Sequence, residues 1–167
     1  MADQTLTATH LRALLEYAPE IGVFTWLASR SNRVKAGGVA GFLDCEGYVR
    51  ITVCGRMYFA HRLAWLYVTG EWPANQIDHR DGVRNNNAIA NLRDVRHSVN
   101  MQNLKHARVD NRSSGLLGVT WHARRKVWQA QMRVDGRNKF LGYHATAEQA
   151  RAAYLETKRR LHPGCTI

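Results

Sequence analysis

The sequence predicts an α+β protein made of two small modules. Residues 47–106 read as a hairpin and a short helix, followed by a strand, a long polar loop, a second strand and a helix. Residues 115–163 read as three strands followed by one helix. The polar stretch 107–114 fits neither periodicity and is predicted to be a linker. With 167 residues the chain is long enough for two modules of about 60 to 100 residues each.

The first 46 residues are predicted to form a helix and a basic loop. Leucines recur at helical spacing over 7–17, where Thr7 or Thr9 can serve as N-cap and Pro19 follows the end of the pattern. Residues 30–41 are rich in glycine and basic side chains, which is typical of a loop. We expect this region to be scaffold.

A hairpin and a short helix come next. Residues 47–53 and 56–60 alternate in polarity and are joined through Cys54-Gly55, which predicts a β-hairpin. The apolar segment 61–68 is predicted to be a helix that stops at Gly70 and is mostly buried by its neighbours.

The most polar part of the chain follows. Residues 76–79 fit a strand end, residues 80–90 form a long polar loop, residues 92–95 fit a returning strand, and residues 98–105 can form a helix.

The C-terminal region alternates with period two. The predicted strands are 118–123, 127–134 and 138–144, and Asp135-Gly136 is a strong turn signal between the last two. Thr146 and Gln149 form a capping-box pattern at the start of a helix over 147–161. The predicted module is a three-stranded antiparallel sheet packed on one helix.

The composition indicates a nucleic-acid partner. There are 24 Lys and Arg against 13 Asp and Glu, giving a formal net charge of +11 and a pI near 10.2. Such an excess attracts polyanions and releases their counterions on binding. A basic protein that is merely soluble is the alternative, so the motifs must decide between them.

Cysteine usage and hydropathy limit the cellular compartments that fit this sequence. Cys45, Cys54 and Cys165 form no Cys-x-x-Cys pair, so neither a disulfide framework nor a zinc ribbon is predicted. No run approaches the roughly 20 apolar residues of a spanning helix, and the first residues do not resemble a signal peptide. We expect reduced thiols in an intracellular protein, in a bacterial or phage-infected cytoplasm, with no membrane partner.

Asp78-His79 combines a general base with a metal ligand. Phosphodiester hydrolysis needs an activated water and positive charge near the phosphate oxygens. The imidazole of His79 suits proton abstraction at neutral pH, and the carboxylate of Asp78 suits Mg²⁺ or Mn²⁺. Asn91, twelve residues later, can hold the loop over the strand, and Asn100, nine further on, can give a second oxygen ligand. A lone Asp-His pair is more often a surface turn, so the prediction depends on the whole set.

This pattern resembles the HNH endonucleases of homing and phage type over about residues 47–105. The matching segments are Asp78-His79, Asp81-Gly82, Asn91-Leu92-Arg93, Asn100-Met101-Gln102-Asn103 and the upstream His61-Arg62-Leu63. The resemblance implies a ββα-metal (His-Me finger) nuclease fold with His79 as general base, Asp78 and Asn100 as metal ligands, and Asn91 as the structural asparagine. Asn100 stands where the family has His, which favours one Mg²⁺ or Mn²⁺ per active site over zinc.

Two residues near this motif keep alternative roles. Arg93 braces the scissile phosphate or the metal-binding carboxylate, or it is a solvated strand residue that pairs with Asp94 or with DNA. His61 is a structural residue at the start of a helix in preference to a metal ligand. A structural zinc site from Cys45, Cys54 and His61 matches no strong spacing.

The second module presents a polar sheet face. Gln129, Gln131 and Arg133 alternate with apolar residues, which any half-buried sheet would show. Gln and Arg also read adenine and guanine edges, and a narrow sheet fits the major groove. The segments Gly118-Val119-Thr120-Trp121, Trp128-Gln129-Ala130, Leu141-Gly142-Tyr143 and 147–154 resemble the Apetala-two (ethylene-response-factor type) DNA-binding domain over about residues 114–162.

The Apetala-two resemblance implies a set of DNA contacts. The candidates for base or phosphate contact are Thr120, His122, Arg124, Gln131, Arg133 and Asn138, with the basic Lys139 beside them. The plant domain has Arg at several positions where this chain has Thr or His, which leaves the preferred sequence open.

Together these observations predict a site-specific, metal-dependent DNA endonuclease of the homing or phage HNH type, acting on double-stranded DNA as a monomer or a dimer. The alternatives are a short-site HNH restriction endonuclease and a DNA-binding regulator that does not cut. Intact Asp78, His79, Asn91 and Asn100 argue against a decayed site.

Overall fold

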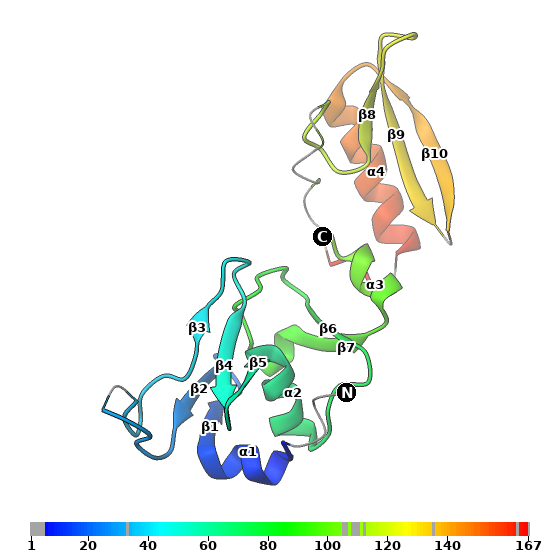
Figure 1. Ribbon diagram of the computed structural model, residues 1–167. Helices are drawn as coiled ribbons and strands as arrows, with labels where there is room; N and C mark the ends of the chain where they lie inside the picture. The colour runs from blue at the N-terminus through cyan, green and yellow to red at the C-terminus, as the bar shows by residue number, and fades with distance from the viewer. Residues whose placement is uncertain are drawn as a thin grey trace. The chain divides into compact units, whose positions relative to one another are not determined.

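The protein forms two compact units, Met1–Arg96 and His97–Ile167, each of mixed α/β structure as predicted. Figure 1 shows the computed structural model, which describes residues 6–32, 34–104, 107, 111, 113–134, 136–162 and 164–166. The predicted linker 107–114 lies partly outside the described residues, and the division between the units precedes it.

The N-terminal helix is shorter than predicted. α1 spans Ala8–Leu14 with Thr7 as its N-cap, and the chain then becomes strand β1, Leu15–Ala18, which pairs antiparallel with β2, Val23–Trp26. The helix predicted up to residue 17 is therefore wrong beyond Leu14. Burial in β1 alternates as in a strand, with the first and third residues buried and the second exposed. The spacing of the leucines is also compatible with a helix, so the sequence did not reveal this alternation.

The predicted hairpin and second helix are confirmed. β4 (Val49–Val53) pairs with β5 (Arg56–Phe59), and a two-residue strand that the sequence did not reveal, β3 (Phe42–Leu43), lies on the other side of β4. α2 spans Ala60–Thr69 and ends at Gly70. The core of the first unit is the set of apolar side chains shared by these elements, chiefly Leu11, Leu15, Phe24, Ile51, Val53, Leu63 and Leu66, all almost fully buried.

Strand, loop and returning strand also form as predicted. β6 spans Gln76–His79 and pairs antiparallel with β7, Leu92–Val95. The connecting loop ends in a single 3₁₀ turn, η2, Ile89–Asn91. Ile77 and Leu92 bury their side chains in the core of the unit, so the ribbon is anchored from both strands.

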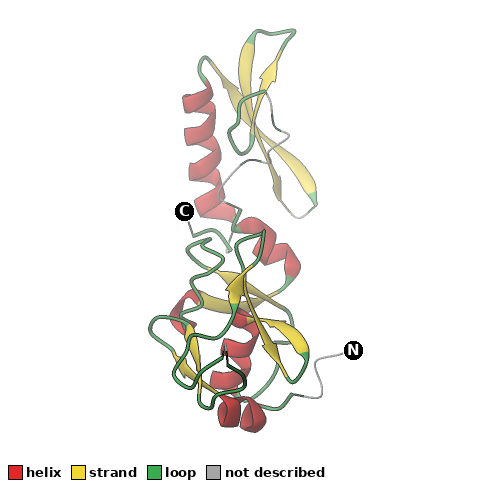
Figure 2. Ribbon diagram, turned by 60° about the vertical axis from the view of Figure 1, so that its left-hand side comes forward, coloured by secondary structure: helices red, strands yellow, loops and turns green. Residues whose placement is uncertain are grey.

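The second unit is a three-stranded sheet packed on one helix. α3, His97–Gln102, comes first, and Lys105 of the predicted helix lies outside the described residues. The strands are β8 (Val119–His122), β9 (Val127–Val134) and β10 (Arg137–His144), with β9 in the middle. Figure 2 shows α4, Ala147–Leu161, alongside this sheet.

Caps and small side chains hold α4 against the sheet. Thr146 and Gln149 form the predicted capping box, since each side chain accepts a hydrogen bond from the backbone N–H of the other. Ala150 packs in the core with Val119 and Ala130. No helix among the described residues is long and apolar enough to cross a membrane.

Gly118 allows the closest approach between sheet and helix. Its φ is +75°, and a Cβ built on it would lie 2.0 Å from the ring of Tyr154 on α4. We expect Gly118→Ala to destabilise the second unit by roughly 2 kcal/mol or more, because it combines a left-handed conformation with a clash against a buried ring.

The matched control is Gly136→Ala. Gly136 has a similar φ of +78°, but an added Cβ would meet nothing within 4 Å. It should show only the conformational cost of about 1 kcal/mol. Amide hydrogen exchange of the second unit measures both variants, and equal losses would contradict the proposed packing.

Candidate functional site

Asp78 and His79 lie side by side at the end of β6, and both are buried. Their exposed fractions are 7% and 5%. In the β6–β7 register Asp78 lies opposite Arg93, and His79 lies opposite Leu92. Adjacent strand residues point to opposite faces, so the carboxylate and the imidazole face different surroundings from adjacent backbone positions.

Arg93 holds the carboxylate of Asp78. Its Nε and Nη2 donate to Oδ2 of Asp78 at 2.8 and 2.6 Å, and both side chains are largely buried. Both bonds end on Oδ2 of the carboxylate. Asp94 accepts instead from the backbone N–H groups of Ala74 and Asn75. Arg93 therefore pairs with Asp78, its neighbour across the two strands.

His79 is bonded to a loop residue that the sequence analysis did not single out. Its Nε2 lies 3.1 Å from Oδ1 of Asn87, which is 1% exposed. Burial lowers the pKa of His79, while the hydrogen bond to Asn87 and the charges of Asp81 and Asp78 oppose that shift. The imidazole is therefore neutral at neutral pH, as a proton acceptor must be.

The polar loop after β6 is held by Asn91. Its Oδ1 accepts from the N–H of Asp81 at 3.0 Å, and its Nδ2 donates to Oδ1 of Asp81 and to the carbonyl of Asn86. Burial alone would raise the pKa of Asp81. The hydrogen bonds from Val83, Asn86 and Asn91 together lower it by more, so the pKa of Asp81 lies below its ordinary value. Asn91 thus ties together the two ends of the loop that begins at His79.

An aromatic wall lies beside His79. The ring of His61, from the first turn of α2, stands edge-on to that of His79 with centroids 5.1 Å apart. Phe59 stacks on His61 at 5.0 Å, and Tyr48 lies 5.5 Å from it. Burial, followed by the charge of His79, lowers the pKa of His61 to about 3, and its Nδ1 is buried without a hydrogen-bond partner. This geometry places His61 against the predicted base and keeps it neutral.

Arginines lie over the same wall. Arg84, from the polar loop, has its guanidinium 5.0 Å from the ring of Tyr48 and donates to the carbonyl of Glu46 at 2.8 Å. Arg50 lies over Phe59 and pairs with Asp44. The hydrogen bond from Arg50, set against the effect of burial, lowers the pKa of Asp44. Cationic groups therefore lie close to the histidine pair.

The carboxylate of Asp78 is an oxygen donor of the kind that Mg²⁺ prefers. Among the residues that the structure describes, no group of three or more His, Cys, Asp or Glu side chains is placed to hold a metal ion. Mg²⁺ needs only one or two protein oxygens besides water and substrate phosphate, and Asp78 offers such an oxygen. Asn100 lies on α3, in the second unit, so its pairing with Asp78 stays a prediction.

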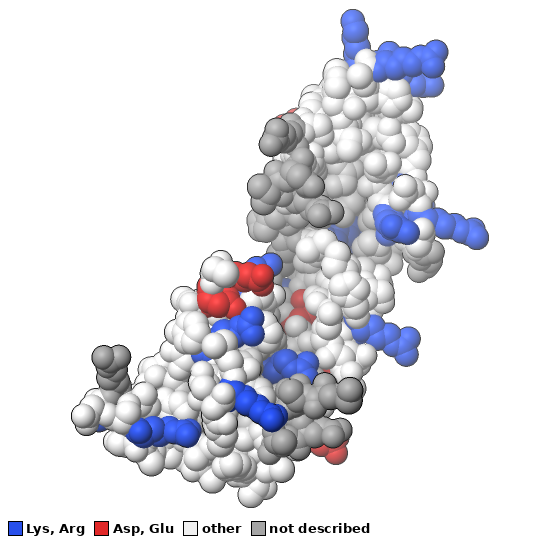
Figure 3. Space-filling view, viewed as in Figure 1, with Lys and Arg blue, Asp and Glu red and all other residues white. Residues whose placement is uncertain are grey.

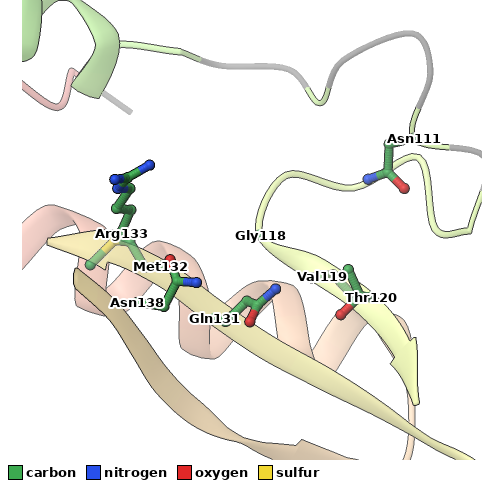
Figure 4. A pocket seen from close by; sticks show the side chains of 8 residues that line it. All are labelled: Asn111, Gly118, Val119, Thr120, Gln131, Met132, Arg133 and Asn138. Carbon is green, nitrogen blue, oxygen red and sulfur yellow. The ribbon is translucent and has the colours of Figure 1, made fainter. Parts of the chain in front are cut away.

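Most of the predicted contact residues of the second unit lie on the open face of the sheet, which is the face opposite Ala130 and Met132. Thr120 pairs with Gln129, and Asn138 pairs with Arg133. A hollow of about 280 Å³ opens on this face, and Figure 4 shows the side chains of Thr120, Gln131, Arg133 and Asn138 around it, with Asn111 across from Thr120.

Not all predicted contacts share that face. Lys139 pairs with the buried Met132, so its side chain leaves the sheet on the side of α4. Arg124 lies in the turn that follows β8, whereas His122 pairs with Val127 and its ring contacts that of Tyr143, so His122 does share the open face. Lys and Arg are the most numerous charged side chains in the view of Figure 3.

Two exposed aromatic residues lie on the open face and were not predicted. The register shifts between Phe140 and Gly142, so Phe140 pairs with Gln131 and Tyr143 pairs with Gln129. Without this bulge, residues three apart would face opposite sides. Their rings contact each other with centroids 4.9 Å apart, and their exposed fractions are 53% and 41%. The two aromatic residues are visible in the sequence of the strand, but the side of the sheet on which they lie depends on the bulge.

The chain matches a known protein family and a known phage protein. Residues 58–102 match the HNH endonuclease family, a span that contains Asp78, His79, Asn91 and Asn100. The chain belongs to the HNH endonuclease family. It is 30% identical over 103 residues to protein 3.8 of Escherichia phage T7, covering 61% of this chain and 83% of that protein.

A solved structure also aligns with the chain. It is the HNH homing endonuclease I-HmuI, described for DNA binding and cleavage, with 24% identity and a TM-score of 0.41 over 54% of this chain. The chain spans about half of its length, 51%.

Neutral His61 makes the stability of the first unit depend on pH. In the unfolded chain a histidine takes up a proton near pH 6.5, whereas burial lowers the pKa of folded His61 to about 3. Its contribution is present above about pH 6.5 and is lost as the pH falls toward 3. We therefore expect the unfolding free energy to fall between about pH 7 and about pH 5, and to fall less in His61→Phe.

Amide hydrogen exchange in the first unit measures this loss at the two pH values. His10→Phe, which removes an exposed imidazole, should behave like the wild type. An equal loss in His61→Phe and the wild type would show that burial of this ring does not control the acid response.

Proposed function

We propose that the protein is a metal-dependent, site-specific DNA endonuclease that hydrolyses phosphodiester bonds with His79 as general base. The observation that carries this proposal is the buried pair at the end of β6. A neutral imidazole lies next to an arginine-held carboxylate inside a segment that matches the HNH endonuclease family. These are the base and the oxygen ligand that the reaction requires.

His79 takes the proton of the attacking water. The water oxygen bonds to phosphorus, its proton passes to the imidazole, and the bond from phosphorus to the 3′ oxygen breaks. The departing 3′ oxygen takes a proton from solvent water, so the products are a 5′-phosphate and a 3′-hydroxyl. Neutral His79 is ready for this role, because burial keeps it unprotonated.

Asp78 and Asn100 would hold one divalent cation, Mg²⁺ or Mn²⁺, per active site. Such an ion, when bound, supplies positive charge for the phosphate oxygens and the departing 3′ oxygen. Arg93 orients the carboxylate of Asp78, and Asn91 holds the loop that follows His79. Oxygen donors favour these ions over zinc.

The second unit selects double-stranded DNA as an Apetala-two-like domain. Its open sheet face combines Gln131, Arg133 and Asn138 around a hollow, with exposed Phe140 and Tyr143 beside them. Amide and guanidinium groups on a narrow sheet can read base edges in the major groove. Two dissimilar DNA-binding surfaces in one chain suit a long asymmetric target, which favours a homing or phage-type enzyme over a short-site restriction enzyme.

The relationship to protein 3.8 of phage T7 supports a role in the cytoplasm of a phage-infected bacterium. The net charge of +11 supports a polyanionic partner there.

The primary test of the enzyme is DNA cleavage. Supercoiled plasmid and phage genomic DNA are incubated with Mg²⁺ or Mn²⁺, with an EDTA control. The wild type should cut, and His79→Ala should lose about 100-fold or more of the rate, because it removes the general base. Binding without a strand break in either metal would support the non-cleaving regulator instead.

Further variants in that assay separate chemistry from folding and binding. Asp78→Ala and Asn100→Ala should also stop cutting while DNA binding is kept, and His10→Ala should cut normally. Loss of folding in all the inactive variants would leave the assigned roles without support, so hydrogen exchange accompanies each rate.

DNA selection by the sheet has its own test. Arg133→Ala should weaken binding of a selected target duplex by about 1 to 3 kcal/mol if the guanidinium reads a base. Lys139→Ala is the matched control, since it removes the same charge from the other side of the sheet. It should lower affinity for selected and random duplexes alike. Equal losses of discrimination in both variants would contradict recognition by the open face.

A further inference from the structure

The HNH match begins at residue 58, so hairpin β1–β2 lies outside it. We propose that this hairpin is a positioning part of the active site, which fixes Asn87 so that its side-chain oxygen accepts a hydrogen bond from Nε2 of His79 and leaves Nδ1 as the nitrogen that receives a proton. The proposal rests on the proposed role of His79 as general base.

The orientation of the Asn87 amide determines which nitrogen of His79 carries the proton. Oδ1 faces Nε2 of His79 at 3.1 Å, while Nδ2 lies 3.4 Å from the carbonyl of Asn85, where it can donate. An amide oxygen only accepts hydrogen bonds, so Nε2 must be the donor. In a neutral imidazole the other nitrogen then carries the lone pair. Nδ1 is thus assigned as the atom that receives the proton of the water.

The hairpin bonds to the backbone at Asn87 and two residues after it. The hydroxyl of Tyr17, on β1, donates to the carbonyl of Asn87 at 2.7 Å, and the N–H of Ile89 donates to the carbonyl of Pro19 at 3.0 Å. Burial, followed by the charge of Glu20, raises the pKa of Tyr17 to about 12, so its hydroxyl keeps the proton that it donates.

The turn of the hairpin also touches the loop directly. Gly22 has a φ of +71°, and a Cβ built on it would lie 2.2 Å from the backbone atoms of Asn87 and Ala88. Only a glycine permits this approach of backbone to backbone. Contacts from Tyr17 on β1 and from Pro19 and Gly22 in the turn therefore converge on the short segment that carries Asn87.

The hydrogen bond from His79 to Asn87 changes the ratio of the two tautomers of the base. One hydrogen bond contributes about 0.5 to 1.5 kcal/mol, which changes the ratio of the two imidazole tautomers by roughly 2-fold to 10-fold. Loss of the basic tautomer should lower the rate of proton transfer by a similar factor. The loss should appear in kcat, because the tautomer affects proton transfer and not DNA binding.

The direct experiment reads the tautomer in the full-length protein without DNA or metal. Histidine is labelled with ¹⁵N, and the His79 signals are assigned by their loss in His79→Gln. The ¹⁵N shifts should show a proton on Nε2 in the wild type and in Asn87→Asp, which keeps an acceptor. In the near-isosteric Asn87→Leu the proton should move wholly or partly to Nδ1. A proton on Nδ1 in the wild type, or an unchanged tautomer in Asn87→Leu, would overturn the proposal.

The role of the hairpin itself is tested by Tyr17→Phe. This variant keeps the ring that packs on Phe24 and Tyr67 but removes the bond to Asn87. It should lower kcat for plasmid cleavage at least about 2-fold with KM unchanged, and shift the tautomer signals toward those of Asn87→Leu. Tyr67→Phe, a hydroxyl removed from the same aromatic cluster, should do neither. Equal effects of the two tyrosine variants would overturn the proposal that hairpin β1–β2 positions Asn87.

The His79 tautomer and the nuclease activity are tested separately. If the wild type cuts no DNA under any condition, the proposed function fails, while the ¹⁵N shifts still decide how Asn87 and hairpin β1–β2 set the tautomer.

Discussion

The pairing of β6 with β7 is the interaction on which the site depends. It sets Asp78 opposite Arg93 and leaves His79 at the strand end, where the polar loop begins. A two-stranded ribbon is marginally stable by itself. Ile77 and Leu92 anchor it in the core of the first unit, so α1, α2 and the neighbouring strands support the positions of both polar residues. A register slip by one residue would exchange the two faces and separate the carboxylate from its arginine.

Burial of polar groups gives the site its chemical character. Asp78 is charged and paired with Arg93, whereas His61 and His79 are kept neutral by burial. Breaking a buried ion pair by removing one partner costs about 3 to 5 kcal/mol, so Arg93 is structurally required as long as Asp78 is ionised. Burial also leaves an uncharged imidazole next to the carboxylate proposed as a metal ligand, which is the combination that base-assisted hydrolysis needs.

Local sequence patterns predicted much of the fold. The Asp78-His79 strand end, the returning strand and the capping box of Thr146 and Gln149 each depend on neighbouring residues, and each formed as expected. Strand β1 was missed because its buried residues continue the leucine spacing of α1, and only pairing with β2 reveals it. Asn87 could not be distinguished from Asn85 and Asn86 in the sequence, since its contact with His79 depends on how the loop folds back. The faces of Phe140 and Tyr143 depend on a bulge that alternation cannot show.

In the proposed reaction, a water activated by His79 attacks phosphorus and expels the 3′ oxygen. Cleavage of plasmid DNA in H₂¹⁸O with Mg²⁺ or Mn²⁺, followed by mass spectrometry of the new ends, tests it most directly. The account predicts one ¹⁸O atom in each new 5′-phosphate and none in the 3′-hydroxyl, with no labelled ends from His79→Ala. Label at the 3′ end, ends without label, or labelled ends formed equally well by His79→Ala would contradict it.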